Sequence, residues 1–218
     1  PFSYDGDALF MNVCIKGVID NGWYLTNEFL SAPNIYYLHD FPVWENLHYL
    51  IIRLIALLTG NFAITINLFY IITYPLVAVS SYFVLRKLNI APLLSFAGAI
   101  LYTFLPYHFF RGQTHLFLGS YFFVPLIILV IIWVYNNELE FITEDRTIAK
   151  TVKSILTSRK LAGSILICLG MSMTGIYYSF FACFFFMIIA VRHVAVKKKM
   201  IPAINALIPI AVMVASII

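Results

Sequence analysis

The chain has 218 residues, of which 62% are hydrophobic and 11% are charged, and its mean hydropathy is +0.91. A soluble domain carries about 25% charged residues, so this composition excludes an ordinary soluble protein and predicts a polytopic membrane protein. The net charge of +4 does not by itself indicate an anionic partner, because in a membrane protein the placement of Lys and Arg matters more than their sum.

The two ends of the sequence lead us to expect a piece of a longer protein. Pro1 stands first instead of a methionine, and Ile218 falls within an apolar run. No signal peptide is visible, because the opening is acidic and aromatic rather than basic and apolar. The three cysteines, Cys14, Cys168 and Cys183, are too few and too scattered for a disulfide framework.

Residues 1–60 are more polar than most of the chain that follows them. They hold six of the ten carboxylates and two of the five histidines. The carboxylates are Asp5, Asp7, Asp20, Glu28, Asp40 and Glu45, and the histidines are His39 and His48. We expect residues 1–60 to form a first extracytoplasmic loop and residues 61–218 to form a transmembrane bundle. Any chemical activity is expected in the loop.

Two short amphipathic helices are predicted in this loop. The first follows the turn pair Asp5-Gly6, takes Asp7 as its N-cap and stops at Asn21-Gly22. Residues 23–42 are expected to form an ordered loop. The second helix covers about 43–58 and has a polar and an apolar stripe, which is typical of a helix in the headgroup plane. Its polar stripe holds Glu45, Asn46, His48, Tyr49 and Arg53, and its apolar stripe holds Trp44, Leu47, Ile51, Leu54, Ile55 and Leu58.

Long apolar runs predict about six membrane crossings, since each crossing needs about 20 apolar residues. The expected spans are 62–85, 91–106, 116–135, a hairpin over 161–191 that turns near Gly175, and a truncated span from Pro202 onward. A polar and aromatic break is expected over 107–115, and a solvated charged connector over 136–160. The predicted fold is therefore all-α, a polytopic transmembrane helix bundle preceded by two interfacial helices.

The distribution of basic residues predicts the orientation of this bundle. Eleven of the fourteen Lys and Arg residues fall in three loops, at 86–87, 146–160 and 192–199. Cytoplasmic loops carry such an excess, so these loops are expected in the cytosol. Residues 1–60, the 107–115 break and the tip near Tyr177 are then expected on the outer side of the plasma membrane.

Several short motifs accompany this layout and point to a family. They are Tyr4-Asp5-Gly6-Asp7, Asn21-Gly22-Trp23-Tyr24-Leu25-Thr26-Asn27, Pro106-Tyr107-His108-Phe109-Phe110-Arg111-Gly112 and Gly175-Ile176-Tyr177-Tyr178. An acidic first outer loop with two interfacial helices before a bundle of spans resembles the GT-C membrane glycosyltransferases. That group includes protein O-mannosyltransferases, lipid A aminoarabinose transferases and the catalytic subunit of oligosaccharyltransferase. The likeness covers most of the chain, although a span that would precede the loop is absent.

The resemblance implies a sugar donor carried on polyprenyl phosphate and an acceptor hydroxyl on a polysaccharide, lipid or protein. A carboxylate of the first outer loop then acts on the acceptor, and Asp7 is the best positional match. Asp5 and Asp7 also form a D-x-D pair, which in some relatives contributes to a divalent metal site for Mg²⁺ or Mn²⁺. Other relatives work without a metal. Membrane lipids are expected as further partners and nucleic acid is not.

The residue types themselves suit this chemistry. A carboxylate that removes the hydroxyl proton accelerates such a reaction by roughly 10²- to 10⁴-fold. Asp7 has an alternative role as a helix N-cap, worth about 1 kcal/mol. Asp40, next to His39, is a candidate second carboxylate, and its alternative is a cap for the helix near Pro42.

The leaving phosphate requires cationic or hydrogen-bonding partners, and a guanidinium group binds phosphate through two parallel hydrogen bonds. Arg111 is the candidate, with His108 and His115 on either side and with Tyr107 and Tyr177 as further lining residues. The alternative is an interfacial arginine within a belt of aromatic side chains. The two histidines match no established zinc spacing.

The sequence is compatible with two other functions. The first is a transporter or flippase of a lipid-linked saccharide, which would place ionisable groups near the middle of its spans. Apart from capping positions, the predicted spans carry none. The second is a membrane scaffold without catalytic activity.

Overall fold

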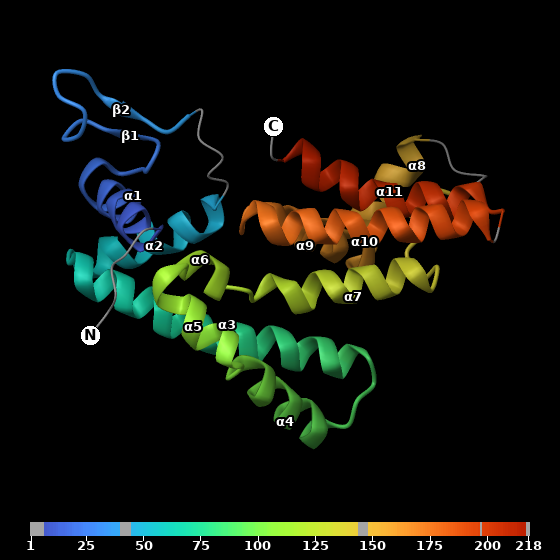
Figure 1. Ribbon diagram of the computed structural model, residues 1–218. Helices are drawn as coiled ribbons and strands as arrows, with labels where there is room; N and C mark the ends of the chain where they lie inside the picture. The colour runs from blue at the N-terminus through green and yellow to red at the C-terminus, as the bar shows by residue number, and fades with distance from the viewer. Residues whose placement is uncertain (1–6, 40–44, 144–147, 197, 217–218) are drawn as a thin grey trace. The chain divides into compact units, whose positions relative to one another are not determined.

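The computed structural model describes residues 7–39, 45–143, 148–196 and 198–216, and Figure 1 shows its elements. These residues form eleven helices and one sheet of two short strands. Contacts within the chain define two compact units, Pro1–Phe122 and Phe123–Ile218. The predicted division into an outer loop and a membrane bundle concerns placement in the bilayer and stays a prediction.

Unit 1 begins with the two predicted short helices, and a small sheet separates them. Its elements are α1 (Asp7–Asn21), β1 (Thr26–Asn27), β2 (Tyr36–Tyr37), α2 (Asn46–Thr59), α3 (Phe62–Lys87), α4 (Pro92–Thr103), α5 (Pro106–Thr114) and α6 (Leu116–Gly119). The strands pair antiparallel, with Thr26 opposite Tyr37. The sequence predicted an ordered loop over 23–42, so this strand pair is the part of it that the prediction missed.

The core of unit 1 joins α1 to α2 through aromatic and aliphatic side chains. Ile15 and Val18 of α1 are buried with Tyr49 and Ile52 of α2. Tyr24 stacks on Tyr49 with ring centroids 3.9 Å apart, and its hydroxyl donates to Asn46 Oδ1 at 2.6 Å. The first predicted amphipathic helix therefore packs against α2 through apolar side chains.

The predicted faces of α2 are wrong. His48 and Tyr49, assigned to the polar stripe, are buried together with Ile52, Ile55 and Ala56. The exposed side carries Leu50, Leu54, Leu57 and Leu58. In a membrane protein this outcome is physically reasonable, because an exposed leucine stripe can face lipid while amphipathic aromatic side chains fill the protein core.

Arg53 connects the two helices through the end of α1. Its guanidinium Nη1 donates to the carbonyl oxygens of Val18 and Ile19 at 2.9 and 3.4 Å. The last carbonyl groups of a helix have no N–H donor inside that helix, and a cation complements their partial negative charge. Arg53, which the sequence predicted on the polar stripe of α2, therefore caps the C-terminal end of α1.

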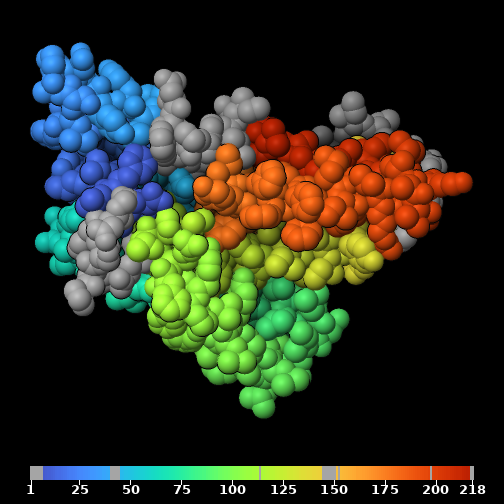
Figure 2. Space-filling model, viewed as in Figure 1, coloured from blue at the N-terminus to red at the C-terminus, as the bar shows by residue number. Residues whose placement is uncertain are grey.

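The helices α3, α4 and α5 follow the apolar runs of the sequence. α3 ends at Lys87, and Asn89 takes a left-handed conformation (φ 62°) while Asn89 and Ile90 donate back to Arg86 and Leu85. This is the usual way to satisfy the last carbonyl groups of a helix. α3 packs along α4, and the two green helices form one continuous surface in Figure 2.

The predicted break over 107–115 is wrong, because most of it is helical. α5 covers Pro106–Thr114, and the segment Pro92–Gly112, which takes in α4 and most of α5, is a candidate span. The predicted span over 116–135 is in turn interrupted, since α6 ends at Gly119 and the next helix begins at Phe123. Two of the polar residues that suggested a break, His108 and His115, contact side chains of other helices, namely Thr73 of α3 and Asp7 of α1.

Unit 2 is a helical cluster around one apolar core. Its elements are α7 (Phe123–Tyr135), α8 (Ile148–Thr157), α9 (Arg159–Ser172), α10 (Ile176–Ala195) and α11 (Met200–Ala215). The turn of the predicted hairpin is confirmed, because α9 and α10 meet at Gly175, whose φ of 128° suits glycine. Among the described helices that are long and apolar enough to cross a membrane, however, only α10 comes from this hairpin. Val130, Phe186 and Ala206 are among the buried side chains that join α7, α10 and α11.

Three helices within the described ranges are long and apolar enough to cross a membrane: Phe62–Lys87, Pro92–Gly112 and Ile176–Ala195. The chain is therefore a membrane protein built mainly from helices, as its composition predicted. The number of crossings, the membrane and the orientation stay predictions.

Candidate functional site

Asp7 and His115 lie together in unit 1, although 107 positions in between separate them in the sequence. Asp7 Oδ2 is 3.1 Å from His115 Nδ1, within the distance of an ion pair when the imidazole is protonated. The Asp7 side chain is 70% exposed and that of His115 is 26% exposed. The pair is thus a solvent-accessible proton acceptor with a defined geometry.

The local fold explains why His115 is available to Asp7. α1 begins at Asp7, so the carboxylate stands in the first turn of that helix, where negative charge is favoured. His115 lies between α5 and α6: its backbone N–H donates to the Arg111 carbonyl oxygen at 2.7 Å, and its own carbonyl oxygen accepts from Gly119 at 3.0 Å. The backbone of His115 is therefore held from both sides.

Arg111 is one helical turn from His115 and is exposed. Its guanidinium carbon lies 6.0 Å from the ring centre of Tyr107, and the Tyr107 ring is 5.8 Å from that of Tyr121. Arg111 has no ion pair with any carboxylate of the described ranges within 4.0 Å. Four predicted site residues, namely Asp7, Tyr107, Arg111 and His115, thus belong to α1, α5 and the turn that ends α5.

His108 does not belong to this group, because its side chain is fully buried. Its Nδ1 donates to the Thr103 carbonyl oxygen at 3.0 Å, and its Nε2 lies 2.9 Å from the Thr73 hydroxyl. Tyr74 stacks on the ring with centroids 3.9 Å apart. Both ring nitrogens are therefore occupied, and His108 fixes α5 against α3 rather than facing a substrate.

Tyr177, Asp5 and Asp40 are the remaining predicted site residues. Tyr177 is exposed in unit 2, in the first turn of α10. Asp5 and Asp40 lie outside the described residues, so the D-x-D pair and the second carboxylate stay predictions. Among the residues that the structure describes, no group of three or more His, Cys, Asp or Glu side chains could hold a metal ion.

His48, which the sequence predicted on the polar stripe of α2, is buried among aromatic rings. It is 0% exposed, and the rings of Phe69, Phe117 and Phe122 lie 5.0 to 5.9 Å from its own. No atom in the described part of the chain meets hydrogen-bond geometry with either ring nitrogen. Burial lowers the pKa of His48 to about 3, and the Ser120 backbone has a smaller opposite effect.

The spacing of residues 48, 52, 55 and 56 is the signal that could have revealed this burial. These positions lie on one side of a helix and include two isoleucines and an alanine. This helical spacing, rather than the polarity of the histidine side chain, indicates that His48 lies in the core.

The free energy of unfolding is expected to fall less at low pH in His48→Phe than in the wild type. The imidazole titrates near pH 6.5 in an unfolded chain and near 3 when folded, so the unfolded state binds the proton first. Wild-type stability therefore falls as the pH drops below 6.5, by about 2 kcal/mol between about pH 7.5 and about pH 5. Thermal unfolding in detergent at these two pH values measures the difference.

The matched control for this prediction is His39→Phe, because His39 is exposed. It should leave the pH dependence of the wild type unchanged. An unchanged pH dependence in His48→Phe would contradict the burial of a neutral imidazole in this aromatic cluster.

The fold and the paired side chains define the chain as a helical membrane protein with an exposed carboxylate and imidazole in contact. No protein-family model matches the sequence, and neither a curated protein nor a solved structure shows detectable similarity to it.

Proposed function

We propose that this protein is an integral-membrane glycosyltransferase that moves a sugar from a polyprenyl-phosphate donor to an acceptor hydroxyl on the outer side of the membrane. The observation that supports the proposal is the 3.1 Å contact between Asp7 and His115, one helical turn from an exposed arginine without a carboxylate partner among the described residues. Proton acceptor and phosphate ligand are the two functions that such a transfer requires.

The proposed reaction begins with the acceptor hydroxyl at the Asp7 carboxylate. Oδ2 lies against His115, which leaves Oδ1 to take the hydroxyl proton. The acceptor oxygen then attacks the anomeric carbon and the bond from that carbon to the phosphate oxygen breaks. The products are the glycosylated acceptor and the lipid phosphate, whose charge Arg111 would bind through two parallel hydrogen bonds. The proton leaves Asp7 for solvent.

Transfer from a radiolabelled polyprenyl-phosphate sugar by the full-length protein in lipid vesicles tests the proposal. Arg111→Gln is expected to raise KM for the donor by about 10- to 100-fold, since a hydrogen bond to a charged group contributes about 1.5 to 3 kcal/mol. The control Arg159→Gln removes an exposed arginine of unit 2 and should leave KM unchanged. Wild-type protein that transfers no sugar from any donor of this class would refute the proposal.

One observation favours the alternative, a transporter or flippase of a lipid-linked saccharide. His108 is an ionisable group inside the candidate span Pro92–Gly112, where the sequence reading expected none. Polar groups within spans are characteristic of transport pathways. Both nitrogens of His108 are, however, engaged by Thr73 and Thr103, which reduces their availability to a substrate. Movement of a fluorescent lipid-linked saccharide across vesicles without transfer would support this alternative.

A further inference from the structure

The hydrogen bonds around His108 offer its ring more acceptors than a neutral imidazole can use. Nδ1 lies 3.0 Å from the Thr103 carbonyl oxygen, and Nε2 lies 2.9 Å from the Thr73 hydroxyl. The same hydroxyl lies 2.6 Å from the Tyr70 carbonyl oxygen. A carbonyl oxygen only accepts, so Nδ1 carries a hydrogen, and Thr73 can donate its single hydrogen either to Tyr70 or to Nε2. Two hydrogen-bonding states of the ring are therefore possible.

The two positions of the Thr73 hydrogen correspond to two charge states of His108. When the hydroxyl donates to Nε2, the ring is neutral and both of its nitrogens are satisfied. When a proton from solvent binds Nε2, that nitrogen donates to the Thr73 oxygen, and the hydroxyl turns to donate to Tyr70 instead. Every donor then has an acceptor, and hydrogen bonds from a charged donor are roughly twice as strong as neutral ones. Rotation of one hydroxyl is therefore enough to accommodate the proton.

The tyrosine rings around His108 also suit a cation. Tyr74 stacks on the imidazole with ring centroids 3.9 Å apart and an angle of 9° between the planes. The hydroxyls of Tyr70 and Tyr74 are 2.6 Å apart, so the two rings support each other. The face of an aromatic ring attracts a cation, and this attraction is larger where water is excluded. Because the His108 side chain is fully buried, the Tyr74 ring contributes under these conditions.

The charges near His108 do not include a carboxylate that would hold a proton by an ion pair. The titratable groups around the ring are Tyr70 and Tyr74 of α3, Tyr121 after α6, and Tyr107 and Arg111 within α5, while α4 contributes the Thr103 carbonyl group. Tyrosine titrates near pH 10, so these rings are neutral at about pH 5 to 8. Arg111 is exposed, and solvent screens its repulsion. No carboxylate of the described ranges lies within 4.0 Å of His108.

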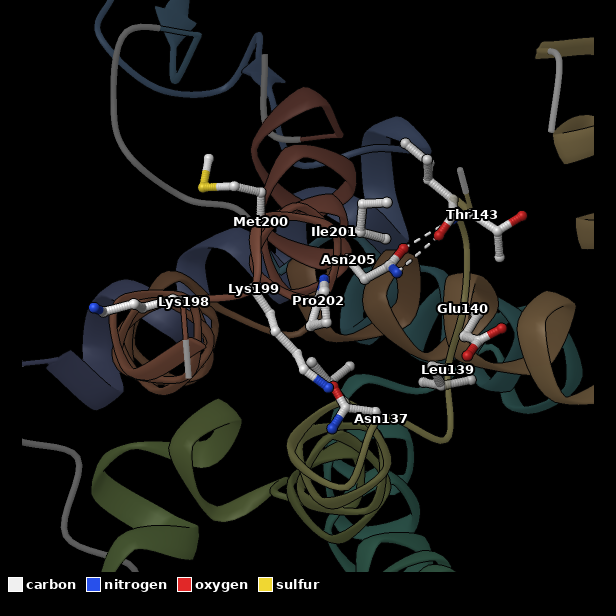
Figure 3. Close-up of a pocket in the computed structure, with 12 residues that line it drawn as sticks. Asn137, Leu139, Glu140, Thr143, Lys198, Lys199, Met200, Ile201, Pro202 and Asn205 are labelled. Carbon is white, nitrogen blue, oxygen red and sulfur yellow. Dashed lines mark hydrogen bonds between the residues drawn. The ribbon is translucent and has the colours of Figure 1, made fainter. Parts of the chain in front are cut away.

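Other buried polar side chains do not have this choice of partners. His48 lies among phenylalanine rings, and no atom of the described chain meets hydrogen-bond geometry with its nitrogens, so it has no acceptor for a second proton. Asn205 lines a cavity of about 590 Å³ in unit 2. It accepts from the Ile142 N–H at 2.8 Å and donates to the Ile142 carbonyl oxygen at 3.0 Å, as the dashed lines in Figure 3 show. The roles of donor and acceptor are fixed in that contact.

The geometry points to His108 as a proton-binding site inside the candidate span Pro92–Gly112, at which the Thr73 hydroxyl changes its acceptor when the imidazole takes up a proton. The site does not depend on the proposed transferase activity. Ionisable groups within membrane spans are usually functional. Uptake of the proton adds a positive charge one helical turn from Arg111, so the charge of this part of α5 changes with pH.

A pH titration of the full-length protein with isotope-labelled histidine, followed by nitrogen NMR in detergent, tests the proposal. The signals of His108 are those that disappear in His108→Gln. Between about pH 8 and about pH 5, Nε2 of His108 is expected to change from an unprotonated to a protonated nitrogen. His48 is expected to stay neutral over this range, because burial lowers its pKa to about 3, and its signals therefore show that the chain remains folded.

Thr73→Val is the variant that tests the acceptor, because valine has nearly the shape of threonine but cannot accept from Nε2. It should lower the proton affinity of His108 by about tenfold or more, the effect of losing a hydrogen bond to a charged group. The matched control is Thr103→Val. It removes a buried hydroxyl that donates to Ala99 and keeps the carbonyl oxygen beside Nδ1, so it should retain the wild-type proton affinity.

Two outcomes would overturn the proposal. The first is a His108 ring that stays neutral at about pH 5, the lower limit of ordinary histidine titration, while the His48 signals show a folded chain. The second is an equal change of proton affinity in Thr73→Val and Thr103→Val, which would remove the specific role of the Thr73 hydroxyl. If Thr73→Val does not fold, the titration of the wild type decides alone.

Discussion

Replacement of Asp7 by asparagine is expected to lower the rate of sugar transfer by roughly 10²- to 10⁴-fold, the usual contribution of a positioned proton acceptor. Asparagine has nearly the same shape, and its side chain can still lie against His115 Nδ1 at the 3.1 Å contact. The substitution therefore removes the basicity while the geometry persists. Stability should change by no more than about 1 kcal/mol, because the exposed contact contributes little. Steady-state kinetics and thermal unfolding of the same preparations measure the two effects.

The matched control for Asp7 is Asp20→Asn. Asp20 lies in the same helix and pairs with Lys16 at 2.7 Å, away from His115. This variant should retain the full rate of transfer. A loss of less than about tenfold in Asp7→Asn would instead assign Asp7 a structural role at the start of α1, which is the alternative that its position in the first turn supports.

The hydropathy of the sequence predicted most of the helix boundaries, because a spanning helix depends on local composition. α3 ends at the two basic residues that follow its apolar run, and the turn between α9 and α10 falls at Gly175. Gly60 closes α2 with φ 59°. In each case one or two residues determine the end of the helix through their charge or their backbone freedom, and a single sequence contains that information.

The faces and breaks of helices were harder to predict, because they depend on partners that are distant in the sequence. His48 and Tyr49 look polar in isolation but fill a core with Phe69 and Phe117. His108 suggested a loop, yet Thr73 and Thr103 bind its two nitrogens and allow it inside a helix. No local pattern identifies such partners, so both errors arise from tertiary contacts.

The candidate site shows the same limit. The residue types Asp7, Arg111 and His115 could be selected from the sequence because they are polar groups beside apolar runs. The contact between Asp7 and His115 could not, since it requires α1 to pack near the turn between α5 and α6. The sequence therefore predicts which residues are candidates for the site, but the packing of the helices determines which of them are in contact.

Replacement of Gly119 by alanine is expected to destabilise unit 1 by about 3 kcal/mol, toward the upper end of the usual cost of overpacking. An added Cβ would lie 2.9 Å from Gly112 Cα and 3.2 Å from Gly112 N. These are backbone atoms, so no side-chain rotation relieves the overlap, and α5 must move away from α6. Thermal or denaturant unfolding in detergent measures the loss.

The control for Gly119 is Gly163→Ala, because an added Cβ at Gly163 meets no atom within 4 Å. Gly163 lies inside α9, where alanine is favoured over glycine by up to about 1 kcal/mol, so this variant should be neutral or stabilised. Equal effects of the two substitutions would contradict the close approach of α5 and α6.

The same close approach links packing to the proposed chemistry, because His115 stands between Gly112 and Gly119. The His115 carbonyl oxygen accepts from the Gly119 N–H at 3.0 Å, so a shift of α6 displaces the imidazole from Asp7. A displacement of about 1 Å can cost about 10²-fold in rate. Gly119→Ala should therefore slow sugar transfer even at temperatures at which the variant is folded. If His115 has no role in transfer, the substitution should lower the unfolding temperature and leave the transfer rate of the folded protein unchanged.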